Sequence, residues 1–138
     1  MEQAVSLNDR QFKLDVEACE IDLVEFNHRA HIRLAYIYLA ENSAAKAYEL
    51  VKEALHQLLI HNNIEPSAKY HETQTKAWLL AVEQFKQKSN QCHSADKFIE
   101  VNPALLDTSL LLTHFSSQKL FSDEARNIFI QPDLNSIS

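Results

Sequence analysis

Apolar residues recur at steps of three and four along the first half of the chain, the spacing of one face of an α-helix. Between Glu25 and Glu41 this face carries His31, Leu34, Ala35, Tyr38 and Leu39. Ser43 then follows a break and is placed to cap a second helix that extends to about His61. The second helix has inward positions at Ala47, Leu50, Val51, Ala54, Leu55 and Leu58. Because the connection is short, we expect the two helices to be antiparallel neighbours.

The second half of the chain carries the signals of two more helices and a terminal one. A stripe formed by His71, Thr75, Trp78, Val82 and Phe85 predicts a third helix over 68–88, after a loop at 62–67. A polar stretch over 89–94 predicts a loop. Asn102 followed by Pro103 reads as an N-cap with proline at the first helical position, and predicts a fourth helix to about Thr113. Ser122 with two following acidic residues predicts a short last helix.

The two ends of the chain give weaker patterns. In residues 1–24 the apolar spacing drifts between helical and alternating, so we expect a leading arm that is helical in part. After the last short helix, Ile128, Ile130 and Pro132 predict an extended tail across the bundle. We therefore expect a single domain over 1–138, with a helical core at 25–115 and a short helix and tail at 116–138.

The hairpin at about 30–60 resembles one tetratricopeptide-type unit. The match rests on the large, small and aromatic positions Leu34, Ala35, Tyr38, Ala47, Ala54 and Leu55. No second copy is found 34 residues away, so a repeat array is not indicated. The resemblance implies a helical pair packed through small residues.

Glycine is absent from the 138 residues, although average usage would give roughly ten. Tight hairpins and phosphate-binding loops depend on glycine, because only glycine reaches positive φ at little cost. Together with the helical spacing, this predicts an all-α fold, a compact antiparallel bundle of four to six helices.

The charge and the cysteine content limit the kinds of partner that we expect for this chain. The formal net charge is −6 and the Lys and Arg residues are scattered, so we expect no nucleic-acid binding. No apolar run is long enough to span a bilayer, and we expect no membrane association and a cytoplasmic location. Cys19 and Cys92 lack metal-ligand spacing, and inert reduced thiols are favoured over a disulfide or a metal role.

The candidate site comes from the histidines, seven in all. His28 and His31 share one face of the first helix, and His71 lies at the start of the third beside Glu72. In an up–down–up arrangement the first and third helices run in the same direction. We therefore expect these four side chains to meet at one end of the bundle, with His56 within reach from the end of the second helix.

Imidazoles and a carboxylate in this arrangement suit a divalent transition metal, with Zn, Fe, Mn and Cu as candidates. A metal held by His28, His31, His71 and Glu72 is one interpretation. A polar pocket without metal and plain structural hydrogen bonding are the alternatives. A full di-iron site built on the Glu25-x-x-His28 and Glu53-x-x-His56 spacings would need further inward glutamates.

Two functional hypotheses follow. In the first, the chain carries out metal-dependent or acid–base chemistry on a small molecule, with Glu72, His71 and Tyr70 as catalytic residues and Tyr70 and Thr75 as hydrogen-bond donors around the site. In the second, the chain is not an enzyme, and the hairpin groove receives a partner peptide or a second copy of the chain in a homodimer.

Three separated blocks of sequence resemble a family of small bacterial helical proteins. The first is Phe26-x-His28-x-x-His31 with Ala35, the second is Tyr70-His71-Glu72-Thr73 with Thr75, and the third joins Ala125-Arg126 to Pro132-Asp133-Leu134. The resemblance covers about residues 26–134. It implies that Arg126 and the Pro-Asp-Leu tail fold back onto the domain, and it implies no substrate.

Overall fold

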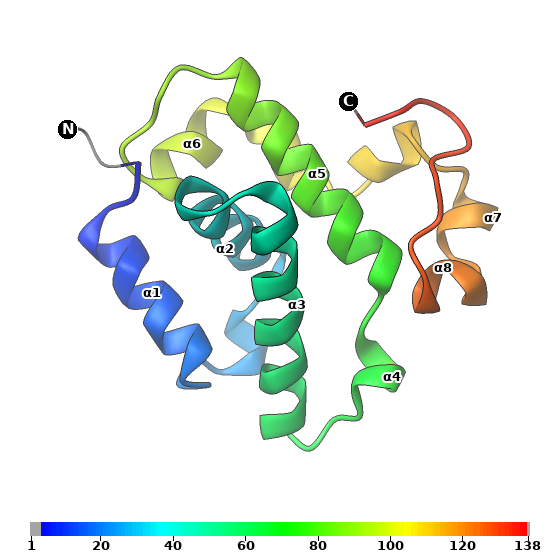
Figure 1. Cartoon of the computed structure of the whole chain (residues 1–138), viewed down its shortest axis with the longest axis horizontal. Helices are drawn as coiled ribbons and strands as arrows, with labels where there is room; N and C mark the ends of the chain where they lie inside the picture. The colour runs from blue at the N-terminus through cyan, green and yellow to red at the C-terminus, as the bar shows by residue number, and fades with distance from the viewer. Residues whose placement is uncertain (1–3, 138) are drawn as a thin grey trace.

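The computed structural model describes residues 4–137, and they are organised around one central helix, α2 (Figure 1). The described residues form eight α-helices and three 3-10 turns, in the order α1 (Leu7–Glu17), η1 (Leu23–Glu25), α2 (His28–Glu41), α3 (Ala44–His61), α4 (Pro66–Lys69), α5 (Glu72–Lys88), α6 (Ala95–Val101), η2 (Pro103–Leu106), η3 (Leu110–Thr113), α7 (Ser117–Leu120) and α8 (Asp123–Asn127). No residue of this range is in a β-strand, which confirms the all-α class. Within 4–137, no helix is both long and apolar enough to cross a bilayer.

Helix α2 is buried on all of its sides. It packs against α1, α3, α5 and α6, and Figure 1 looks almost along its axis, with these helices around it. The predicted inward face is buried, but so are residues on the other faces, and the complete set is Ala30, Ile32, Leu34, Ala35, Tyr36, Ile37, Tyr38 and Leu39. A helix that is apolar all round belongs in the interior, whereas a helix with one apolar face lies at the surface.

Two helix starts lie where the capping residues predict them. The Ser43 side chain accepts a hydrogen bond from the Lys46 backbone N–H at 3.2 Å, and α3 ends at His61 as expected. The Ser122 hydroxyl accepts from the Ala125 N–H at the start of α8. In both cases a side-chain oxygen satisfies a backbone donor that has no partner inside the helix.

The expected third helix over 68–88 is interrupted. Its first turn is the separate helix α4, and Tyr70 and His71 have extended backbone before α5 begins at Glu72. His71 is the N-cap of α5, because its Nδ1 accepts the N–H of Gln74 at 3.1 Å. Histidine is not among the preferred capping residues. The sequence pattern therefore gave no sign that a new helix begins after His71.

The expected fourth helix from Pro103 to Thr113 is also wrong. The segment is two 3-10 turns, η2 and η3, separated by an Asp107 side chain that accepts from the backbone N–H and the hydroxyl of Ser109. Such local bonding competes with helix continuation. Helix α6, which the pattern did not predict, follows the predicted 89–94 loop and buries Ala95, Phe98 and Ile99.

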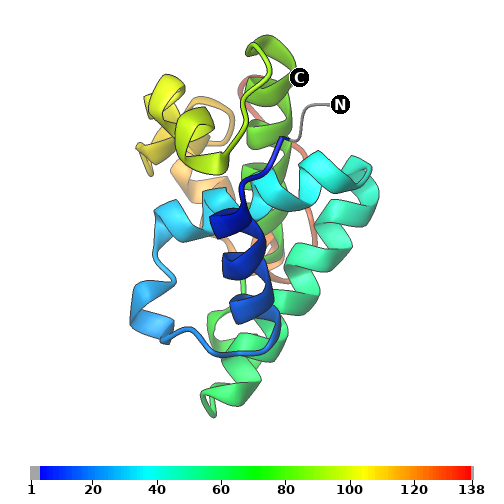
Figure 2. The same ribbon diagram turned by 90° about the vertical axis from the view of Figure 1, so that its left-hand side faces the viewer.

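The relative direction of the helices differs from the up–down–up expectation. Figures 1 and 2 show α2 crossing α5 at a steep angle, with α2 running across the view in Figure 2 and α5 upward. The two helices are therefore not parallel. Residues at the starts of both helices nevertheless line the same cavity.

The C-terminal segment folds back, as the family resemblance implies. Arg126 donates a hydrogen bond to the carbonyl of Ala68. The Asp133 carboxylate accepts one from the N–H of Ser116, and the N–H of Leu134 donates to the backbone carbonyl of His114. In Figure 1, α7 and α8 lie on the side of α5 away from α1. The segment thereby supports the α4–α5 connection from outside.

A fully buried carboxylate joins the leading helix to the rest. One oxygen of Asp9 accepts from the N–H of Ser6, which completes the capping box of α1, and from the N–H of Ala95 at 2.8 Å. The other oxygen pairs with Arg33 of α2 at 3.2 Å. Three elements that are distant in sequence, α1, α2 and α6, therefore meet at one side chain.

We predict that Asp9→Ala lowers the free energy of unfolding by about 3 kcal/mol, because it leaves the Arg33 charge and the Ala95 N–H without their partner. Asp15→Ala removes a carboxylate from the same helix whose side-chain bond, to Gln11, is exposed, and we expect a loss below about 1 kcal/mol. Urea denaturation of both variants measures the difference. Equal losses would show that Asp9 has no special role.

Candidate functional site

A cavity of about 330 Å³ lies where the first turns of α2 and α5 approach the C-terminal half of α3. Its wall is apolar over Leu23, Phe26, Leu55, Leu58, Leu59 and Trp78. Its polar residues are Asn27, His28, His31, Lys69, Tyr70, His71, Gln74 and Thr75. Small-molecule sites usually combine an apolar wall with polar groups that can orient a ligand, and this cavity has both.

His31 is the central polar group of this cavity. Its Nε2 is shielded from solvent and has no hydrogen-bond partner among residues 4–137. Burial, together with the nearby His28, lowers the pKa of His31 from 6.5 to about 4. The imidazole is therefore neutral at pH 7, and it offers an unused donor or acceptor, depending on its tautomer.

Tyr70 supplies a second polar atom without a bonded partner. Its hydroxyl is buried, and burial raises its pKa to about 12, although the neighbouring Thr75 hydroxyl favours the ionised form slightly. The two hydroxyls do not form a hydrogen bond of standard geometry. The extended backbone between α4 and α5 is what points Tyr70 into this position, and its ring packs against His56 at 4.4 Å between centroids.

His28 and His71 line the same cavity, and each bonds a distant backbone carbonyl through Nε2. The Nε2 of His28 bonds the Leu105 carbonyl at 2.8 Å, and the ring contacts Trp78 edge-on. His71 uses Nδ1 to accept from Gln74 and Nε2 to donate to the Leu120 carbonyl at 3.0 Å. Burial lowers the pKa of His71, and its two bonds define a neutral tautomer.

Glu72 is outside the cavity. Its carboxylate accepts a hydrogen bond from Tyr48 and pairs with Lys52 of α3 at 3.1 Å. Burial raises the pKa of Glu72, and the charge of Lys76 opposes that shift. Its position one residue after the N-cap directs the side chain toward α3 rather than toward His31.

The residues proposed as metal ligands do not fit a metal in this arrangement. A histidine ligand must offer a free nitrogen lone pair. Both nitrogens of His71 are bonded, whereas His28 donates from Nε2 and its neutral ring keeps the lone pair of Nδ1. Glu72 is held by α3 instead. Within residues 4–137, no three His, Cys, Asp or Glu side chains are grouped so that they could hold a metal ion.

The sequence predicted that His28, His31, His71 and Glu72 meet, with Tyr70 near them. The three histidines and Tyr70 line the cavity, and Glu72 does not. The sequence did not predict the residues that form the walls of the cavity. Trp78, Phe26 and Asn27 also line the cavity, although no sequence pattern gave them a role there. The signal for Trp78 was its place on the same stripe as Thr75, one turn further along α5. His56 lies behind Tyr70 and bonds the Lys52 carbonyl of its own helix.

The lowered pKa of His31 predicts a pH-dependent stability. The unfolded chain takes up a proton at His31 near pH 6.5, whereas the folded chain does so only near pH 4, so stability falls as the pH drops between these values. The contribution of this one residue is up to about 3 kcal/mol. Denaturation curves at pH 7 and pH 4.5 should show a smaller difference for His31→Gln than for the unchanged chain.

The control for this measurement is His61→Gln, which removes an exposed imidazole at the end of α3. Its pH dependence should match that of the unchanged chain. A pH dependence that His31→Gln leaves intact would contradict the assignment of a neutral, shielded His31.

The bonded state of the other imidazoles predicts that the chain, purified without a histidine tag, binds Zn²⁺ no more tightly than a His28→Gln, His71→Gln double variant. Elemental analysis after equilibrium dialysis measures this. Stoichiometric metal that is lost in the double variant would instead support the metal-dependent hypothesis.

Comparisons with known proteins add no relative. No protein-family model, no curated protein and no solved structure matches the chain. The likeness to a bacterial family and to a tetratricopeptide-type hairpin stays a prediction from sequence. The function must therefore be argued from the cavity itself.

Proposed function

We propose that the cavity between α2, α3 and α5 binds a small neutral molecule with an apolar body and one carbonyl or hydroxyl group, and that His31 exchanges a proton with it. The single observation that carries this proposal is the shielded His31 Nε2, which has no partner in the described part of the chain. A buried polar atom without a partner destabilises the fold by about 1–3 kcal/mol, and a ligand that bonds it removes that cost.

The lining supports a neutral ligand rather than a charged one. None of the described residues around the cavity is a carboxylate, and its one lysine, Lys69, is exposed. The four apolar side chains Leu55, Leu58, Leu59 and Trp78 form one side and favour a hydrocarbon body. A volume of about 330 Å³ limits the occupant to a small molecule.

The proton chemistry follows from the two unpartnered atoms. When His31 Nε2 is the unprotonated nitrogen, it can remove a proton from the carbon beside a ligand carbonyl. The carbonyl oxygen then becomes an enolate oxygen and accepts a hydrogen bond from Tyr70, which stays protonated because of its raised pKa. Return of the proton from the His31 imidazolium to carbon restores both partners.

The low pKa of His31 sets a condition on this step. A neutral imidazole with a pKa of about 4 is a weak base, so the imidazolium needs a nearby negative charge. The enolate oxygen formed in the same step provides it, in a site whose apolar wall strengthens the attraction. We therefore expect the activity to be constant around pH 7 and to fall as the pH drops toward 4.

The second hypothesis, in which the hairpin groove receives a partner peptide or a second copy of the chain, has less support. Helix α5 packs against both helices of the α2–α3 hairpin, so the surface that a peptide would need is covered in part by the chain's own helix. A cytoplasmic location and a homodimer remain predictions from sequence.

To test the proposal we would use cyclohexanone in D₂O and follow deuterium exchange at the carbons beside its carbonyl by NMR. The chain should accelerate the exchange, and Tyr70→Phe should slow it by about tenfold, because it removes one hydrogen bond to the enolate oxygen. Binding is followed in parallel through the fluorescence of Trp78, the one tryptophan of the chain, which lines the cavity.

The matched control is Tyr48→Phe, which removes a hydroxyl from α3 that bonds Glu72 outside the cavity. Its exchange rate should equal that of the unchanged chain. Binding without exchange would overturn the proton-transfer part, and the absence of any fluorescence change up to the solubility limit would overturn the site.

A further inference from the structure

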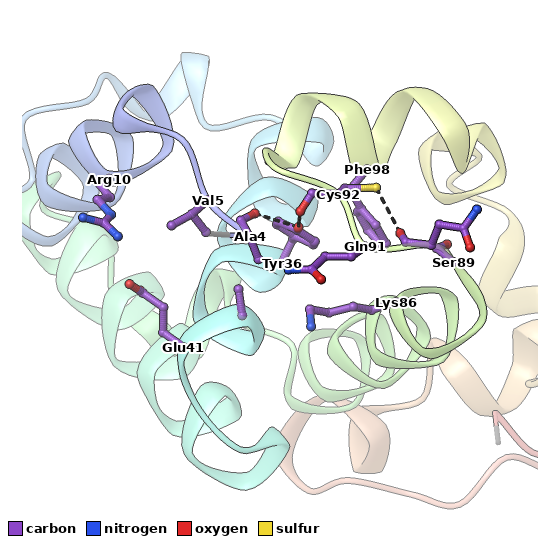
Figure 3. Close-up of a pocket in the computed structure, with 12 residues that line it drawn as sticks. Ala4, Val5, Arg10, Tyr36, Glu41, Lys86, Ser89, Gln91, Cys92 and Phe98 are labelled. Carbon is purple, nitrogen blue, oxygen red and sulfur yellow. Dashed lines mark hydrogen bonds between the residues drawn. The ribbon is translucent and has the colours of Figure 1, made fainter. Parts of the chain in front are cut away.

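A second and larger cavity, of about 550 Å³, lies at the opposite ends of the same two helices (Figure 3). It is enclosed by the last turns of α2 and α5, by the start of α1 with the residues before it, and by the loop that leads to α6. Its lining consists of Ala4, Val5, Arg10, Tyr36, Ala40, Glu41, Lys86, Ser89, Asn90, Gln91, Cys92 and Phe98. It shares no residue with the cavity around His31.

The floor of this cavity is a rigid aromatic pair. The rings of Tyr36 and Phe98 stack with centroids 4.5 Å apart, and both side chains are almost wholly buried. The Tyr36 hydroxyl donates to the Ala4 carbonyl at 2.8 Å and lies 3.3 Å from the Cys92 carbonyl. These bonds hold the chain before α1 and the α5–α6 loop in place, so the cavity is formed before any ligand arrives.

Among the described residues that line the cavity, Lys86 is a cation without a carboxylate partner. Figure 3 shows Arg10 and Glu41 facing each other on one side and Lys86 extending from α5 toward them. Glu41 is already paired with Lys13, which is not part of the lining, at 3.0 Å. Lys86 is partly buried and forms no ion pair with any of residues 4–137.

An unpaired lysine held in a cavity is a strong recognition element for an anion. An ammonium group that loses part of its water needs a negative partner to recover the lost free energy. The carbonyls at the end of α5 also favour a cation, but a helix end carries only about half a unit charge and so offsets the charge of Lys86 in part. Glu41 is the one carboxylate among the described lining residues, and it pairs with Lys13 and not with Lys86.

We propose that this cavity is a binding site for a small organic carboxylate with an apolar body, the carboxylate on Lys86 and the body beside Val5 and Tyr36. The site is independent of the proposed function of the His31 cavity. The loop residues Ser89, Asn90 and Gln91 surround the head group with uncharged polar side chains and select for an anion of modest size. A neutral molecule of the same shape gains nothing from Lys86.

Cys92 provides the readout, because it lines the cavity while Cys19 does not. Both are free and partly exposed thiols. Their rates of alkylation by iodoacetamide are measured by mass spectrometry in the same sample, with benzoate as the probe and benzamide as its neutral counterpart. Benzoate should slow the alkylation of Cys92 in proportion to occupancy and leave Cys19 unchanged, and benzamide should protect neither.

Lys86→Gln should weaken the protection by benzoate about tenfold, whereas Lys88→Gln, which removes an exposed lysine two residues further along α5, should not change it. Equal protection by benzoate and benzamide would overturn the recognition of an anion. Equal slowing of both cysteines, or protection that Lys86→Gln does not weaken, would overturn the site. Cyclohexanone exchange in the same variants stays unchanged, which separates this test from that of the His31 cavity.

Discussion

The enclosure of α2 is the constraint on which the rest of the structure depends. A helix with buried residues on every face needs partners in all directions, and α1, α3, α5 and α6 supply them. Because these partners are short or cross α2 steeply, they cannot cover it evenly along its length. The covering is complete in the middle of α2 and leaves a cavity at each end. Both candidate sites are consequences of wrapping one apolar helix with a small number of others.

The buried polar groups divide into those that hold the wrapping together and those that do not. Asp9 makes bonds to α1, α2 and α6 and leaves no oxygen unused, so it acts as a structural joint. His28 and His71 likewise each use a ring nitrogen to bond the backbone carbonyl of a distant segment. His31 and Tyr70 stand apart, because their polar atoms are shielded and have no such task. In a fold where neighbouring polar groups are satisfied, these two are where a ligand would bring the largest gain.

The two cavities differ in the kind of molecule that they favour, and the difference comes from charge. The described residues around His31 include one lysine, which is exposed, and no carboxylate, so a neutral molecule fits. At the other end, Lys86 lies beside a polar loop and favours an anion. Since both sites touch α2 and α5, occupation of either one would brace the same pair of helices. This gives a small chain without glycine two preformed surfaces for small molecules.

The sequence by itself determined the all-α class, the span of α3 with its Ser43 cap and the start of α8. These follow from hydrophobic spacing and from side chains that cap their own helix, both of which are local properties. Only the tertiary structure decided what each site residue does. The Leu120 and Leu105 carbonyls that occupy His71 and His28 come from segments far along the chain, and the pairing of Glu72 with Lys52 depends on how α5 meets α3. The spacing of the histidines shows that they can meet. Whether a ring nitrogen keeps a free lone pair for a ligand or a metal depends on its hydrogen-bond partners, which no local sequence pattern encodes.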